Sequence, residues 1–169
     1  MSTKQENYGA DYKQHLLEQY KLYVEMTDRI SDRRQTANSF FLSINTAIVA
    51  LVSYVGLCVG KGGNFSWLIS CAGMVLCYLW YRLIRSYKDL NSAKFKVIHE
   101  MEKDLPFSPY DVEWEKAGRG EDRRLYLPFT HIEINVPWIF FVIHAFVFIW
   151  SIGLLPWLKT ICVVLGNKA

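Results

Sequence analysis

The stretch that decides the fold is residues 40–84, FFLSINTAIVALVSYVGLCV-GKGGN-FSWLISCAGMVLCYLWYRLI. Residues 40–59 are 20 positions without a charge, about the length that crosses the hydrocarbon core of a bilayer. A polar turn at 60–64 leads into residues 65–84, whose single charge, Arg82, is close enough to the end to reach the headgroups. Because soluble core helices rarely run so long without a charge, the stretch predicts a transmembrane hairpin rather than a soluble protein.

A third apolar run begins near Val136 and continues to Leu155, where Pro156 and Lys159 interrupt it. The apolar piece that follows, residues 161–165, is too short for a fourth span. We interpret it as a kinked extension of the third helix at the far interface, and its return to the membrane stays an open alternative. The predicted fold class is therefore an all-α membrane protein with three transmembrane helices.

The distribution of Lys and Arg predicts the orientation. Of the 19 basic residues, six precede the first span, ten lie between Arg82 and Arg124, and three lie elsewhere. Since positive charge is retained on the cytoplasmic side, the N-terminus and the central segment are expected in the cytoplasm and the C-terminus outside it.

The polar segments on both sides of the hairpin predict helices that extend the spans into the cytoplasm. Each carries an apolar stripe at steps of three and four residues, typical of an amphipathic helix. The first stripe is Leu16, Tyr20, Tyr23, Thr27 and Ile30, and the second is Leu83, Tyr87, Leu90, Lys94, Val97, Met101 and Leu105. With no proline or glycine between stripe and span, we expect a long antiparallel hairpin; two independent helices on the membrane surface are the alternative.

Pro106 ends the second extension, and Ser108, Pro109 and Asp111 predict a capping box for a short helix from Pro109 to Ala117, closed by Gly118. A charged loop follows. The chain thus divides into an N-terminal cytoplasmic helix at 1–38, the transmembrane hairpin at 39–84, a cytoplasmic helix and loop at 85–135, and the third span with its kinked end at 136–169.

Small residues occupy one face of each of the first two spans, which allows close helix packing within the hairpin or between subunits. They are Ser39, Ser43, Thr46, Ala47, Ala50, Ser53 and Gly60 in the first span and Ser66, Ser70, Gly73 and Cys77 in the second. A water-lined pore would use the same residue types. Ser43 and Ser53 are therefore candidates for either role.

Asn45 and His144 are the most deeply placed polar residues of the apolar runs. A polar group inside a membrane is costly unless it is paired, so each is a functional candidate by default. For His144 we favour structural hydrogen bonding as a neutral imidazole, with a pore or proton-sensing role and metal binding as alternatives.

The cytoplasmic loop carries the densest chemistry of the chain. Its binding candidates are Trp114, Arg119, Arg123, Arg124, His131 and Glu133. His131 and Glu133 alone are too little to predict a metal or acid–base site. Gly118-Arg119-Gly120 follows a helix instead of preceding one, which is the wrong context for a nucleotide fingerprint. Ion pairs with neighbouring helices or anionic headgroups are the ordinary interpretation.

Other function classes lack support in the sequence. A net charge of +3 without a basic, aromatic-rich patch argues against nucleic acid as a partner. The four cysteines form no C-x-x-C pair, so they are interpreted as buried small hydrophobes, and no metal, cofactor or catalytic residue is predicted.

Several stretches resemble a known family. They are residues 20–26 (YKLYVEM), 28–41 (DRISDRRQTANSFF), Leu105-Pro106, Pro109-Tyr110-Asp111, Glu113-Trp114, Gly118-Arg119-Gly120, 127–133 (LPFTHIE) and Val136-Pro137-Trp138. Together they are similar to the RipA-like family of small bacterial membrane proteins, described as octameric, over roughly residues 16–150. The resemblance implies a location in the bacterial inner membrane and a ring-like homo-oligomer, and it implies no catalytic residues.

These observations favour a non-enzymatic homo-oligomer in contact with membrane lipids, acting as a scaffold, a sensor or a gated pore. The alternative is a binding module in which the loop at 118–133 recognises a cytoplasmic protein, a nucleotide signal or a lipid headgroup, including as the membrane effector of a defence system.

Overall fold

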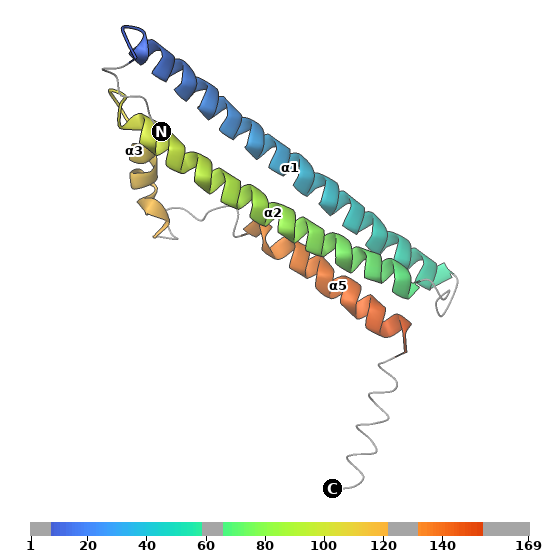
Figure 1. Ribbon diagram of the computed structural model, residues 1–169. Helices are drawn as coiled ribbons and strands as arrows, with labels where there is room; N and C mark the ends of the chain where they lie inside the picture. The colour runs from blue at the N-terminus through green and yellow to red at the C-terminus, as the bar shows by residue number, and fades with distance from the viewer. Residues whose placement is uncertain (1–7, 59–65, 122–131, 154–169) are drawn as a thin grey trace. The chain divides into compact units, whose positions relative to one another are not determined.

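The computed structural model describes residues 8–58, 66–121 and 132–153. In these ranges all regular structure is helical, which confirms the predicted all-α class (Figure 1). The helices are α1 (Tyr12–Cys58), α2 (Ser66–Glu102), α3 (Pro109–Lys116), the 3₁₀ turn η2 (Gly118–Gly120) and α5 (Asn135–Ser151). The polar turn after the first apolar run, the loop at 122–131 and the kinked end after Gly153 lie outside the described residues.

The chain forms two compact units, to which α1 and α2 both contribute. Unit 1 contains residues 1–36 and 85–131, and unit 2 contains residues 37–84 and 132–169. As predicted, each long helix runs without a break from its apolar part into its polar part. No proline or glycine interrupts α1 before Gly56 or α2 after Gly73.

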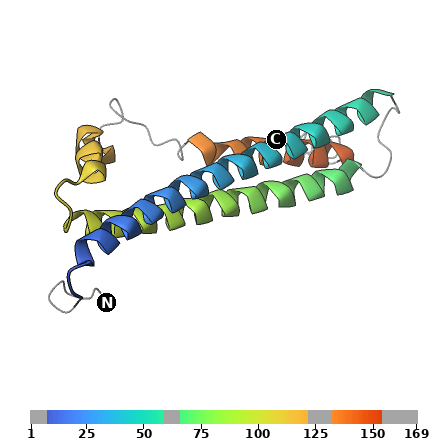
Figure 2. The same ribbon diagram turned by 90° about the horizontal axis from the view of Figure 1, so that it is seen from above.

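In unit 2, α5 lies alongside α1 and α2 (Figure 2). The inward face of α2 is made of residues at steps of three and four. They are Ser70, Gly73, Cys77, Trp80 and Ile84. Gly73 is buried, and the other four are at most 3% exposed. Gly73 allows the close approach of α5, because a Cβ at this position would come within 2.6 Å of the His144 ring.

Two helices, α1 and α2, are long and apolar enough to cross a membrane. α5 is apolar but has only 17 residues, a rise of about 26 Å. The third span therefore stays a prediction, as does the orientation of the termini.

In unit 1, the first half of α1 packs against the second half of α2. The predicted stripe of α1 is confirmed, since its members are buried or half-buried, with Thr27 only 4% exposed. The predicted stripe of α2 is wrong in part. Leu90 and Val97 are 47% and 41% exposed, whereas Ile98 is fully buried, so the inward face lies about one residue further along the helix. Lys94 was placed correctly, because its Nζ lies 4.4 Å above the ring of Tyr23.

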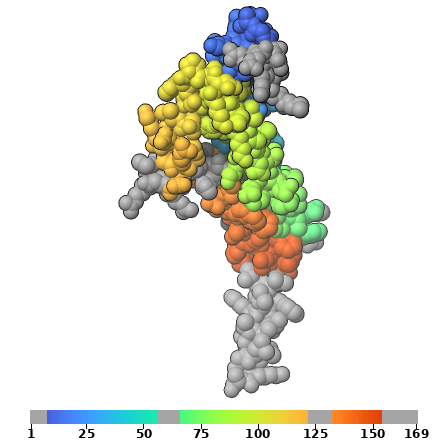
Figure 3. Space-filling model, turned by 60° about the vertical axis from the view of Figure 1, so that its left-hand side comes forward, coloured from blue at the N-terminus to red at the C-terminus, as the bar shows by residue number. Residues whose placement is uncertain are grey.

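α3 follows the end of α2 and lies against it (Figure 3). Pro109 begins the helix as predicted, and Gly118 with φ +72° follows its end. The predicted capping box is wrong, because the side chain of Ser108 does not cap α3; its hydroxyl donates to the carbonyl oxygen of Glu102 at 3.3 Å instead. The acceptor that α3 needs comes from the carboxylate of Glu102.

Candidate functional site

A group of three polar side chains is buried in the middle of unit 2, one from each of its helices. Asn45 of α1 accepts two hydrogen bonds at its Oδ1, from Sγ of Cys77 at 3.2 Å and from Nε2 of His144 at 3.2 Å. Its Nδ2 donates to the carbonyl oxygen of Phe41 at 2.8 Å. Because Oδ1 can only accept, Nε2 of His144 carries a hydrogen, which a neutral imidazole provides.

These contacts decide where Asn45 and His144 lie. Their side chains are 0% and 1% exposed, so both face the interior of the protomer rather than its surface. The contacts agree with the interpretation that His144 makes a structural hydrogen bond as a neutral imidazole. Cys77 joins them as a hydrogen-bond donor, beyond the role of small hydrophobe that its sequence context predicts.

A second polar chain crosses unit 2 near one end of the apolar part of α1. Asn38 of α1 accepts from Nε1 of Trp80 at 2.8 Å and donates to Oε1 of Glu133 at 2.8 Å. The Trp80 ring stacks on Phe41, with ring planes 8° apart. Glu133 was expected in the charged loop, but the structure gives it a place in the packing of unit 2.

Ser43 and Ser53 are both exposed, and at about 100° per residue they lie about 160° and about 80° around α1 from Asn45. Their hydroxyls donate to the carbonyl oxygens of Ser39 and Val49, each at 2.8 Å. The two serines are therefore not brought together with Asn45 and His144.

Unit 1 contains a buried carboxylate that connects three helices. Glu102, the last residue of α2, is 1% exposed. Its Oε1 accepts from the hydroxyl of Tyr20 in α1 at 3.0 Å and from the backbone N–H of Tyr110 in α3 at 2.9 Å. Its Oε2 accepts from the backbone N–H of Asp111 at 3.2 Å, and Nδ1 of His99 lies 3.6 Å from it. We call Glu102, Tyr20 and the first turn of α3 the Glu102 clasp.

The clasp satisfies the free N–H groups at the start of α3, and a negative charge is favourable at this end of a helix. Burial of the phenol is the main cause that raises the pKa of Tyr20 far above its ordinary value, and the hydrogen bond to Glu102 is the second cause. Burial also raises the pKa of Tyr110, with smaller contributions from the charges of Asp28 and Glu113. Both tyrosines are therefore neutral hydrogen-bonding groups across the physiological range.

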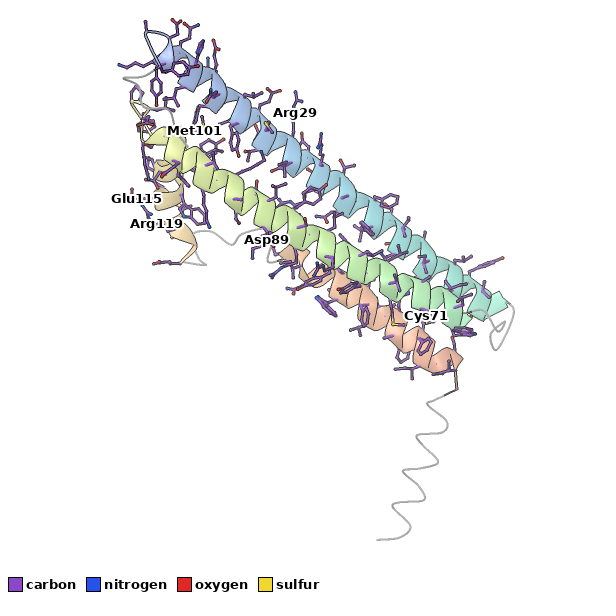
Figure 4. All side chains as sticks on the ribbon, viewed as in Figure 1. Arg29, Cys71, Asp89, Met101, Glu115 and Arg119 are labelled. Atoms are coloured by element: carbon purple, nitrogen blue, oxygen red, sulfur yellow. The ribbon has the colours of Figure 1, made fainter. Side chains whose placement is uncertain are left out.

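The turn after α3 presents an exposed arginine. Arg119 has φ +51° and lies between two glycines that also have positive φ, Gly118 and Gly120. Its guanidinium is 3.8 Å from the carboxylate of Asp111, with half of the side chain in solvent. Arg119 and Glu115 project from this end of unit 1, while Arg29 projects from α1 on the side away from α2 (Figure 4).

The loop candidates are thus only partly brought together. Trp114 of α3 lies against Gly120 of η2, where a Cβ would meet its ring at 3.2 Å, and both Trp114 and Arg119 are exposed. Arg123, Arg124 and His131 lie outside the described residues. Asn38, Trp80 and Glu102 were not singled out from the sequence as site residues, and Tyr20 was predicted only as part of the apolar stripe, because the side chains that they bond to in neighbouring helices are between 42 and 95 residues away in the chain.

The arrangement indicates binding and packing more than covalent chemistry. Across residues 8–58, 66–121 and 132–153, no three His, Cys, Asp or Glu side chains come together as a metal-ligand group. Every polar atom of Asn45 bonds to a neighbouring group, and Glu102 accepts at both of its oxygens. The hydrogen bonds of Asn45 and Glu102 connect neighbouring helices to one another.

Comparison with known proteins supports the membrane assignment. The family model described as Octameric membrane protein family (8xMP) matches residues 17–153. No curated protein and no solved structure matches the chain.

Proposed function

Because the chain belongs to the Octameric membrane protein family, whose name indicates a membrane protein that forms octamers, we propose that it is a non-enzymatic gated pore of the bacterial inner membrane. In this proposal unit 2 crosses the membrane, and unit 1 lies in the cytoplasm and receives the signal. Positive charge supports that orientation, since 16 of the 19 Lys and Arg residues lie before the first span or between Arg82 and Arg124.

The observation that carries the proposal is that α1 and α2 supply both units. In the described part of unit 2, the two long helices are the continuations of those that form unit 1. A change in the packing of α1 against α2 in unit 1 therefore acts on the same helices that cross the membrane. A scaffold would not need this shared construction, whereas a sensor that controls a pore does.

Ion efflux from liposomes tests the proposal, with the Glu102 clasp as the perturbation. We compare the purified octamer with the variants Glu102→Gln, which weakens the clasp, and Glu100→Gln, a change of the same kind at an exposed position of α2. We expect at least a tenfold increase in flux with Glu102→Gln and no change with Glu100→Gln. Absence of flux in all three proteins, at matched octamer content, would overturn the pore.

A binding module is the second candidate, and the turn at Arg119 is the observation that favours it. Arg119 has 54% of its side chain exposed and lies in η2, whose Gly120 packs against Trp114 of α3, itself 38% exposed. An exposed guanidinium suits an acidic or phosphate-bearing partner. Arg119→Glu should then abolish the biological activity while the octamer stays intact, and a fully active Arg119→Glu protein would exclude this candidate.

A further inference from the structure

The three helices of unit 2 leave different kinds of side chain uncovered. α5 exposes bulky residues, among them Ile139, Val142, Phe146 and Trp150, each about 60% exposed. α2 exposes Leu68, Val75, Tyr78 and Leu79, each at least 50% exposed. Such surfaces are suited to lipid tails.

α1 also exposes bulky residues, Phe40, Leu42, Leu51 and Tyr54, each at least 45% exposed, and beside them a row of small residues. The exposed positions of its apolar part include Ser39, Ser43, Thr46, Ala47, Ala50 and Ser53. At about 100° per residue these six fall within an arc of about 120°, on the side of the helix away from Asn45. We call this arc the small-residue face of α1.

Three of the four hydroxyl groups of this face bond within α1. Ser43, Thr46 and Ser53 donate to the carbonyl oxygens of Ser39, Leu42 and Val49, each at 2.8 Å. Between Ser39 and Ala50 the face carries only small side chains, which lets the backbone of another helix approach closely, whereas Tyr54, 66% exposed, lies on the same side of α1 one turn further along. In a bilayer, close approach of this kind gains packing contacts that lipid tails do not supply as well.

α1 is also the less covered of the two long helices. Within the protomer, 6% of its apolar window is buried, against 28% for α2. With so little cover inside the protomer, the apolar part of α1 leaves most of its surface to lipid or to another chain. The family to which the chain belongs assembles as octamers, so further copies of the chain are present to cover it.

We propose that the small-residue face of α1 packs against a second copy of this chain and is one of the protomer–protomer contacts of the octamer. The proposal names the contact of the assembly and rests on octamer formation, which the proposed function also needs. It does not depend on the assembly conducting ions. In a closed ring each protomer offers two different surfaces, and this face is one of them.

Bulky substitutions on the face test the proposal by mass. Ala47→Trp places an indole on the face, about midway along its length, and Val142→Trp, on the exposed side of α5, is the matched control. By light scattering in mild detergent, we expect the wild type and Val142→Trp to remain octamers. For Ala47→Trp the ratio of smaller species to octamers should rise at least tenfold, while the helicity measured by circular dichroism stays unchanged. An intact octamer for Ala47→Trp would overturn the proposal.

Photo-crosslinking keeps the test decisive where a variant folds poorly. With p-benzoylphenylalanine in place of Ala50 in liposomes, we expect covalent dimers, and with the same probe in place of Val142 we expect mainly lipid adducts. Dimers from Val142 but not from Ala50 would refute the contact. If octamers form and crosslink at Ala50 but pass no ions, the proposed function fails and the contact stands.

Discussion

Glu102→Gln is the substitution that tests the structure of unit 1 most directly. The carboxylate accepts three hydrogen bonds, two of them from the first free N–H groups of α3. An amide has one oxygen, so one of these buried N–H groups would face an NH₂ and lose its acceptor, which costs about 1–3 kcal/mol. Loss of the negative charge at the start of α3 adds roughly 0.3–1 kcal/mol. We therefore expect α3 to lose about 1.3–4 kcal/mol of docking stability.

Hydrogen exchange measured by mass spectrometry reports this loss locally. α3 has eight residues and is too short to be stable by itself, so its amides are protected only while it is docked. A loss of about 1.3–4 kcal/mol corresponds to exchange faster by about tenfold to several-hundred-fold, at 1.4 kcal/mol per factor of ten. The peptide that covers residues 106–120 should show this change, and peptides of α5 should not.

Glu100→Gln is the control, because Glu100 is on the same helix and pairs only with Lys103 at the surface, an interaction worth at most about 1 kcal/mol. Exchange in its α3 peptide should remain within a factor of about five of the wild type. If Glu102→Gln changed the α3 peptide no more than Glu100→Gln does, Glu102 would not hold α3, and the clasp would be refuted.

Three more outcomes follow from the contacts of single residues. Gly73→Ala should destabilise the protein by about 2–4 kcal/mol, because its methyl group overlaps the His144 ring. In thermal unfolding, the double variant with His144→Ala should recover part of this loss. If the losses of the two single variants simply add, the contact is contradicted. The folded state favours the neutral phenol of Tyr20, so its contribution to stability is complete below the ordinary pKa of 10.0 and is lost as the pH rises above that value. Between pH 8 and 11 the melting temperature of Tyr20→Phe should therefore fall less steeply than that of the wild type. Parallel curves for the two proteins would exclude this effect. Arg119→Gly should be neutral or stabilising by up to about 1 kcal/mol, because glycine adopts φ +51° without strain, and a destabilisation above 1 kcal/mol would show that the Asp111 contact is worth more than the strain.

The long-range plan of the chain could be predicted from the sequence because it depends on local pattern. The uncharged runs and the stripe at Leu16, Tyr20 and Thr27 each repeat over many residues and predict long helices that continue from apolar to polar sequence. The depth of His144 in its apolar run favoured a hydrogen-bonded neutral imidazole, because an unpaired polar group is costly inside a membrane, but its bond to Asn45 was not predicted.

What could not be predicted depends on contacts between distant parts of the chain. Ser108 has the right residue type to cap α3, but the carboxylate of Glu102 occupies the same N–H groups and accepts more strongly. The polar half of α2 has apolar residues on more than one side, so its pattern alone does not decide whether Val97 or Ile98 faces α1. Glu133 belongs by sequence to a charged loop, and its bond to Asn38 depends on how α5 packs.

The two asparagines of α1 have a consequence for how the helices find one another. Asn38 and Asn45 are seven residues apart, about two helical turns, and each bonds to a side chain of α2 and to a residue near or within α5. An apolar helix in lipid can slide or rotate against its neighbours at little cost, whereas two polar pins at a fixed spacing fit only one alignment. Shifting α1 by a single turn would leave both amides without their partners. The two asparagines together therefore select one register of α1 against its neighbouring helices. A variant with leucine at both positions should stay helical but adopt several alignments of α1.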